Sequence, residues 1–254
     1  MIESVSFAQG LMLIAIGFLA GGINTFAGGG SNLSLPALMM IGLPADIANA
    51  TNRVAIFMQS LTATHGYYVN DKLDKASIKN IFIPIILGGL LGAIAASYLD
   101  VEILKPALLA TMVGVSLWVV FKSDVKSDGS KEETVSCFDS KLGFISTFFA
   151  GFYGGFIQAG VGFVLITVFV GVLNHGLLKA NALKIVAALM FTTISLVVFI
   201  YRDQVAWMAG IYLAIGSILG ALVSVKLSID IKPKTLKICV LVMTVVASAA
   251  ALFI

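Results

Sequence analysis

Long apolar runs, separated by short polar stretches, dominate this chain of 254 residues. A polar stretch at 122–141 divides the runs into two series, each with a long run, a glycine-rich break, a short run and three long runs. The runs are 7–27, 33–43, 54–68, 81–98, 104–121, 142–158, 161–173, 185–201, 204–225 and 236–254. Membrane barrels show short alternating strands instead of such continuous runs. We therefore expect an all-α polytopic membrane protein with about eight to ten membrane segments.

The composition is that of a chain solvated by lipid. Hydrophobic residues make up 59% of the sequence and charged residues 11%, whereas soluble domains carry about 25% charged residues. The net charge of +3 gives no support to nucleic-acid binding. No cluster with metal-ligand spacing, Ser/His/Asp set, Walker loop or dinucleotide motif is present, so we predict no metal, no cofactor and no enzymatic activity.

The two series of runs indicate an internal duplication. "GGLLGAI" (88–94) parallels "GSILGAL" (216–222), and "ANATNRVA" (48–55) parallels "KANALKIV" (179–186), in the same order along the chain. We expect a first transmembrane repeat at 1–121, a cytoplasmic linker at 122–141 and a second transmembrane repeat at 142–254. The motifs "GGLLGAI" and "GSILGAL" both contain a G-x-x-x-G pattern, which brings helices close together either within one protomer or in a homodimer.

The distribution of lysine and arginine predicts the topology. Positive charge stays on the cytoplasmic side of short loops. Twelve lysines fall in four regions that this rule places inside, namely Lys72, Lys75, Lys79, Lys122, Lys126, Lys131, Lys141, Lys179, Lys226, Lys232, Lys234 and Lys237. Lys105 and Arg202 then lie outside. Each half crosses the cell (inner) membrane an odd number of times, so the two repeats are inverted and both termini are non-cytoplasmic.

The first break, "NTFAGGGSNLSLP" (24–36), interrupts a membrane segment. The short run that follows it makes roughly 16 Å of helix, too little to cross a core of about 30 Å. We expect a turn inside the membrane, with Ser31 or Asn32 capping a half-helix whose N-terminus suits an anion. The second break, "GGFIQAGVGF" (154–163), has Gln158 as its polar group. The residues expected to form the turns are Gly28, Gly29, Gly30, Gly160 and Gly162.

A simpler interpretation remains for both breaks. Small residues let membrane helices approach each other closely, so the glycines could serve packing alone.

Two cations fall inside predicted helices. Helices over 44–68 and 176–201 place Arg53 and Lys184 roughly 13 and 12 Å deep, at equivalent positions of the repeats. All thirteen acidic residues lie in loops or at helix ends, so none neutralises these cations. A charge inside a membrane marks a function, and two unpaired cations require an anion. The alternative is that the helices begin later and both side chains snorkel to the interface.

The residues of both breaks resemble a known family. "GGINTFAGGGSNLSLPALMMIGLPADIANATNR" is similar to the first-repeat signature of the TauE/SafE sulfite-exporter family of membrane permeases, nearest to its YfcA-like branch. "GFYGGFIQAGVGFVLI" with "KANALK" resembles the second-repeat signature, and the resemblance covers nearly the whole chain. It implies export or import of small anions, including sulfite and sulfur-containing organic acids. By resemblance, the motif positions that line the anion site are Asn24, Ser31, Asn52, Arg53 and Lys184.

The chain departs from the family pattern in two places. Asn24 stands where the branch often has Asp, which removes a group for proton coupling. Gln158 with "AGVG" replaces a Gly-Pro-type second break.

The sequence thus predicts a secondary permease for a small anion that works by alternating access. Arg53 and Lys184 supply charge, and the hydrogen bonds come from Asn24, Ser31, Asn52 and Gln158. Removing either cation is expected to abolish anion binding without loss of stability, because an unpaired buried cation is itself costly. A passive anion channel is the alternative. A membrane enzyme or scaffold is a third possibility, which the absence of a catalytic set disfavours.

Overall fold

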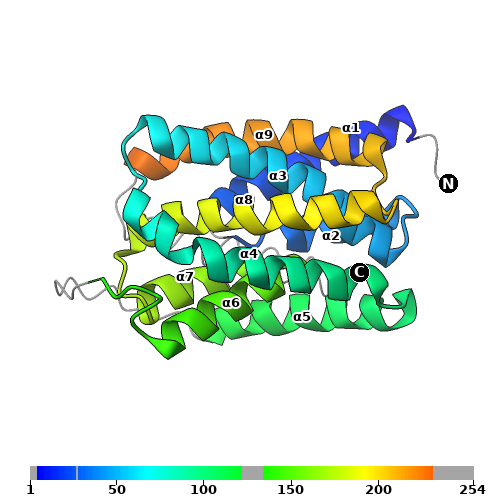
Figure 1. Ribbon diagram of the computed structural model, residues 1–254. Coiled ribbons are helices and arrows are strands. Elements are labelled where there is room, and N and C mark those ends of the chain that lie inside the picture. The colour runs from blue at the N-terminus through cyan, green and yellow to red at the C-terminus, as the bar shows by residue number, and fades with distance from the viewer. Residues whose placement is uncertain (1–4, 27, 122–133, 231–254) are drawn as a thin grey trace.

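The structure is a computed structural model that describes residues 5–26, 28–121 and 134–230. Within these ranges the chain folds into helices without strands. The helices are α1 (Phe7–Phe26), α2 (Ser31–Met40), α3 (Ala45–Val69), α4 (Lys75–Tyr98), α5 (Val101–Phe121), α6 (Lys141–Phe156), α7 (Val161–Gly171), α8 (Leu177–Tyr201) and α9 (Trp207–Asp230). Figure 1 shows them side by side along one direction. The predicted run at 236–254 and most of the predicted linker lie outside the described residues.

The described helices differ in whether they can cross a membrane. Four are long and apolar enough to cross a membrane: α1, α4, α8 and residues Trp207–Leu227 of α9. By contrast, α2 and α7 have 10 and 11 residues, about 15 Å of helix, which is half of a membrane core. The all-helical class predicted from the sequence is confirmed for the described residues, and so are the two short helices after the breaks.

Local sequence signals explain where several helices begin. Asp74 precedes α4 and accepts hydrogen bonds from the Ala76 N–H and the Ser77 hydroxyl. Ser140 precedes α6, and its hydroxyl accepts from the Gly143 N–H. Pro44 precedes α3. The Asp74 and Ser140 side chains satisfy donors that the first turn of a helix leaves free, whereas Pro44 makes no side-chain hydrogen bond to α3.

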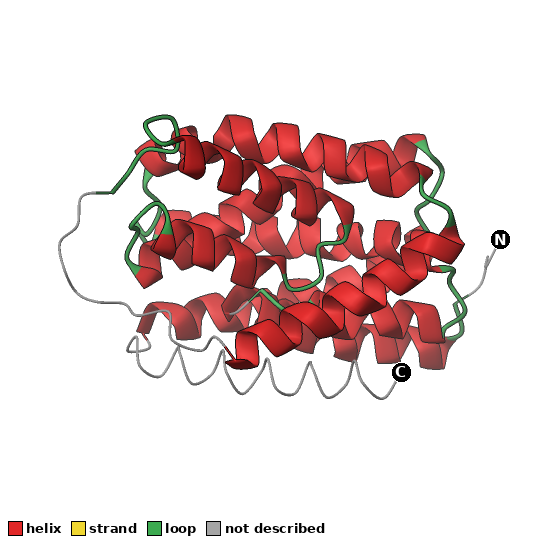
Figure 2. Ribbon diagram, turned by 90° about the horizontal axis from the view of Figure 1, so that it is seen from below, coloured by secondary structure: helices red, strands yellow, loops and turns green. Residues whose placement is uncertain are grey.

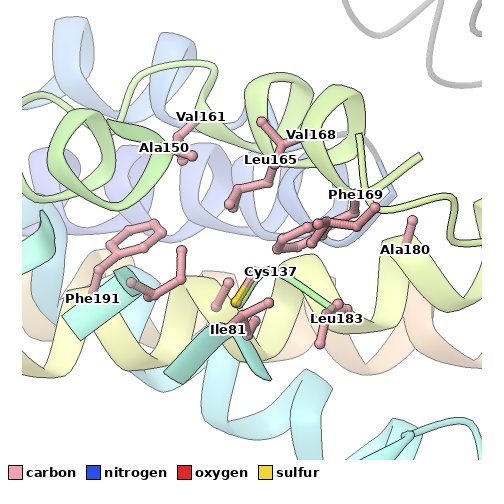
Figure 3. Packing of buried hydrophobic residues seen from close by; sticks show 13 residues of the cluster. Ile81, Cys137, Ala150, Val161, Leu165, Val168, Phe169, Ala180, Leu183 and Phe191 are labelled. Atoms are coloured by element: carbon pink, nitrogen blue, oxygen red, sulfur yellow. The ribbon is translucent and has the colours of Figure 1, made fainter. Parts of the chain in front are cut away.

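Apolar side chains form two large clusters in the bundle. The first joins α1, α2 and α3 to α9 and includes Leu13, Leu38 and Leu213. The second joins α6, α7 and α8 to α4, and its side chains are drawn in Figure 3. Each cluster therefore takes three helices from one half of the sequence and one helix from the other half.

Glycines bring the helices of different halves into backbone contact. A Cβ atom on Gly92 of α4 would lie 2.0 Å from the Phe152 carbonyl oxygen of α6. A Cβ atom on Gly220 of α9 would lie 2.0 Å from the Phe18 carbonyl oxygen of α1. The G-x-x-x-G patterns thus make contacts within the protomer, which decides between the two uses that the sequence allowed.

We expect Gly92→Ala and Gly220→Ala to lower the melting temperature in detergent. The added methyl group overlaps a carbonyl oxygen of the neighbouring helix, and such overpacking costs about 1–3 kcal/mol. Gly171→Ala is the matched control, since a Cβ atom there would meet nothing within 4 Å. Equal melting temperatures for all three variants would contradict the packing role.

Candidate functional site

The two helix breaks meet inside the bundle. Figure 2 shows stretches of loop halfway along the helices as well as at their two ends. Gly28 has φ of 91° and Gly160 has φ of 69°, a left-handed conformation that favours glycine. The Gly162 N–H donates to the Gly28 carbonyl at 3.3 Å, and a Cβ atom on Gly28 would lie 2.2 Å from Gly162 Cα. Gly28 and Gly160 therefore form turns, so packing alone does not account for the breaks. Gly162, which was expected in the second turn, lies inside α7 and packs closely against Gly28.

The start of α2 differs from the expected arrangement. Gly30 is its N-cap residue with φ of −61°, and Ser31 and Asn32 lie within the first turn of the helix. Asn24 provides the capping oxygen instead, because its Oδ1 accepts from the Gly30 N–H at 2.8 Å. The prediction of a Ser31 or Asn32 cap is thus wrong, since the turn brings a side chain from the last residues of α1 to this position. The Asn24 side-chain amide is thus hydrogen-bonded within the chain, to Gly30 and to Gln59.

Two of the predicted site residues bind each other. Asn52 of α3 donates to the Ser31 hydroxyl at 3.3 Å and accepts from the Ser34 hydroxyl at 2.7 Å. All three side chains are buried, and this polar cluster fastens α2 to α3.

Arg53 is fully buried and holds the end of α6. Its Nη1 donates to the Gly154 carbonyl and to Gln158 Oε1. Its Nη2 donates to the Gly155 carbonyl at 2.9 Å and to Asn49 Oδ1 at 3.4 Å. The two glycines lie in the last turn of α6, whose carbonyl groups have no partners further along the helix. The guanidinium group therefore acts as a cap for that helix end.

Lys184 holds the end of α1 in the same way. Its Nζ donates to the carbonyls of Asn24 and Thr25, at 3.1 and 3.2 Å, and to Asn181 Oδ1 at 2.7 Å. The Asn181 amide also donates to the Tyr67 hydroxyl at 3.0 Å. Asn24 and Thr25 belong to the last turn of α1. Each half of the chain thus supplies a cation that donates hydrogen bonds to the carbonyl groups at the end of a broken helix in the other half.

Both cations lie in neutral surroundings. Arg53 is 0% and Lys184 1% exposed, so neither side chain snorkels to an interface. Throughout the described ranges, each donates only to backbone carbonyl and side-chain amide oxygens, and neither forms an ion pair with an acid. Two positive charges without a countercharge leave this region complementary to an anion.

A cavity of about 20 Å³ lies beside the crossing of the two breaks, with room for about one water molecule. Its lining combines polar side chains with an apolar wall. The lining residues are Asn24, Gly28, Ile56, Gln59, Ser60, Gln158, Val161, Gly162, Leu165, Lys184, Ile185 and Ala188. Of the predicted site, Asn24, Gln158 and Lys184 thus come together here. Ser31, Asn52 and Arg53 do not line the cavity.

Gln59 and Ser60 belong to this site although the sequence pattern did not single them out. Gln59 Oε1 accepts from the Asn24 amide at 3.0 Å. Ser60 is fully buried, and its hydroxyl has no hydrogen-bond partner in the part of the chain that the structure describes. Ser60 follows Arg53 by about two helical turns, so these two residues share a face of α3, whereas Gln59 lies on a neighbouring face. The spacing is a sequence signal for Ser60, and Gln59 is located by its contact with Asn24.

Gln158 has an unusual backbone conformation. Its φ is 68°, which costs a non-glycine residue roughly 1–2 kcal/mol. Gln158 lies two residues before the N-cap of α7, and Gly28 occupies the corresponding position two residues before the N-cap of α2. The Gln158 side chain accepts from Arg53 and donates to the Thr192 hydroxyl at 3.1 Å, and these bonds offset the strain. Such strain in a buried polar position points to a function.

Comparisons with known proteins identify the family and several relatives of the chain. The sequence model of the family described as "Sulfite exporter TauE/SafE" matches residues 13–251. The chain is 30% identical over 225 residues to a "Probable membrane transporter protein" of Haemophilus influenzae, with 89% of this chain and 87% of that protein covered. It is 26% identical over 243 residues to "Probable membrane transporter protein YfcA" of Escherichia coli K12, with 95% and 89% covered. No solved structure matches.

We expect Arg53→Met and Lys184→Met to lower the melting temperature and to abolish anion binding. Their hydrogen bonds to the helix ends reverse the sequence-based expectation for stability. Arg53→Met leaves the Gly154 and Gly155 carbonyls unpaired, and Lys184→Met leaves the Asn24 carbonyl unpaired, at about 1–3 kcal/mol per group. Lys179→Met, at an exposed position of α8, is the control and should leave both properties unchanged. Unaltered melting temperatures in both buried variants would remove the capping role.

A second prediction separates strain from side-chain bonding at Gln158. Gln158→Gly and Gln158→Ala lose the same hydrogen bonds, but only glycine adopts the left-handed conformation without strain. The glycine variant should be the more stable by about 1 kcal/mol, measured by thermal unfolding in detergent. If the alanine variant melts at the same temperature or higher, the backbone at this position is not strained.

Proposed function

The chain belongs to the TauE/SafE family of sulfite exporters, and we propose that it is a secondary transporter that carries a small anion by alternating access. The family consists of membrane transporters, so the chain is a multi-pass membrane protein with a transport role rather than an enzymatic one. The proposed substrate is a sulfite-like oxyanion or a small sulfur-containing organic anion. The observation that carries the proposal is a pair of fully buried cations, without acids nearby in the described ranges, of which Lys184 lines a small cavity and Arg53 holds Gln158 of its lining.

The small size of the cavity favours a carrier over the alternative channel. Its volume of about 20 Å³ holds one water molecule, whereas sulfite has four heavy atoms. The helices around it must therefore move apart to admit the anion. The bonds of Lys184 to α1 and of Arg53 to α6 hold the two broken helix ends in place beside this cavity. Breaking one set at a time provides alternating access to the two faces.

The packing of the helices supports an inverted repeat. Gly88 and Gly92 of α4 lie against Phe148 and Phe152 of α6 in parallel order, and α9 lies against α1 in the same manner. The first helix of each half thus packs on the fourth helix of the other half. In Figure 1, α1 and α6 begin at opposite ends of the bundle. Exchanging the halves and reversing the direction preserves these contacts, as an inverted duplication requires.

The described charges support the predicted orientation. One end of the bundle, where α3 connects to α4 and where α6 and α8 begin, carries Lys72, Lys75, Lys79, Lys141, Lys179 and Lys226. The opposite end carries Lys105 and Arg202, and the Arg202 guanidinium lies 4.2 Å from the centre of the Tyr98 ring. The first end is the proposed cytoplasmic face.

Transport assays with the purified protein in proteoliposomes test the function. We expect uptake of sulfite, or of another anion in a panel with sulfate, methanesulfonate and acetate, to saturate with concentration. The same anion trapped inside should accelerate it, because a carrier returns faster when loaded. Uptake that rises linearly and ignores the trapped anion would indicate the channel. Absence of any flux would favour a scaffold.

Reporter fusions test the inverted topology. A fusion at residue 130 should report a cytoplasmic location, and a fusion at the C-terminus should report the opposite compartment, because the positive charges follow the cytoplasmic side. Matching signals from the two fusions would contradict an inverted second half.

A further inference from the structure

We propose that the two buried cations have different tasks: Lys184 together with Ser60 contacts the anion, whereas Arg53 is a positioning residue that acts through Gln158. This inference rests on the proposed function, since it assigns roles within the same anion site. The two cations occupy equivalent places in the halves of the chain and cap equivalent helix ends. Their relation to the cavity is nevertheless different.

Lys184 lines the cavity, and its ammonium group can exchange a hydrogen bond within the protein for one to a ligand. Its ammonium group has three donors, and carbonyls of α1 and the Asn181 amide oxygen occupy all of them. These acceptors are neutral, so an anion in the cavity competes with them through a charge-assisted bond. The flexible lysine stem lets the donors turn toward the ligand. When the ammonium group turns, the end of α1 loses a partner.

Ser60 adds a hydroxyl donor that nothing else uses. The residue lines the cavity, it is fully buried, and its Oγ has no hydrogen-bond partner among the described residues. An unpaired buried hydroxyl is costly, so a partner that arrives in the cavity gains from it. Gln59, beside it, has its amide oxygen engaged by Asn24, which leaves its amide NH₂ group for the same ligand.

Arg53 contacts neighbours that shield it from the cavity. It is absent from the lining, and its two terminal nitrogens donate to Asn49, Gly154, Gly155 and Gln158, while its Nε has no hydrogen-bond partner among the described residues. A guanidinium fork that spans two successive carbonyls is preorganised and less free to turn than an ammonium group. Gln158 does line the cavity, and its amide oxygen is held by Arg53. Arg53 thus orients the side chain that faces the ligand.

The first experiment measures anion uptake for Ser60→Ala in proteoliposomes. The loss of one hydrogen bond to a charged group should raise KM about tenfold or more, while Vmax changes less. Thr62→Ala is the matched control on α3, because its hydroxyl donates to Met58 of its own helix and it does not line the cavity. An unchanged KM for Ser60→Ala would overturn the role of this hydroxyl.

The second experiment is a double-mutant cycle with Arg53→Lys and Gln158→Gly. Lysine keeps the charge but cannot hold two carbonyls and Gln158 together. If Arg53 acts through Gln158, Arg53→Lys raises KM in the wild-type background and has no further effect in the Gln158→Gly background. If Arg53 binds the anion directly, the effect persists and the two changes add. Because KM is measured on purified folded protein, a loss of stability does not imitate either result.

Anion-dependent thermal shifts separate this inference from the proposed function. The probes are sulfite, sulfate, methanesulfonate and acetate. Stabilisation by one of them that Lys184→Met and Ser60→Ala both weaken supports the site, even if the wild-type protein shows no uptake and the transport proposal fails. Additive effects in the cycle, with transport intact, overturn only the division of tasks. No stabilisation by any probe overturns both.

Discussion

A helix that ends inside a membrane leaves its last carbonyl groups without water to bond, and this constraint governs the centre of the molecule. The ends of α1 and α6 meet the constraint by accepting hydrogen bonds from Lys184 and Arg53. Each donor lies on a helix of the other half, so satisfying the backbone also joins the halves. The breaks and the buried charges are therefore one feature, and the positive character of the cavity follows from it.

Much of this architecture is visible in the sequence because it depends on local patterns. The run lengths and the Pro44 signal lead to α3 within one residue of its bounds, and α8 is equally close. The two cations stand out because charge is rare in apolar helices. Contacts between distant segments are a different matter. Ser31 and Asn52 look like ligands by motif, yet they bond each other.

The cavity itself could not be located from the sequence for the same reason. The partner of Arg53 at Gly154 lies in the other half of the chain, and no periodicity encodes that pairing. Ser60 is one serine among many until the fold places it beside Lys184. The capping of Gly30 by Asn24 likewise depends on how sharply α1 turns back into α2. Local rules predict the helices, whereas the tertiary arrangement decides which polar groups remain available to a ligand.

The exchange of the fourth helices between the two apolar clusters has a consequence for biosynthesis. The cluster of α1, α2 and α3 includes Leu213 of α9, which the ribosome makes long after the first three helices. Chains are synthesised from the N-terminus, and domains generally fold as units in that order. Here the first cluster is incomplete until the second half of the chain has been inserted. Until then α1, α2 and α3 lie in the bilayer without the helix that covers their apolar side chains. Truncated chains that stop before α9 would leave those side chains uncovered, which makes such chains substrates for membrane quality control.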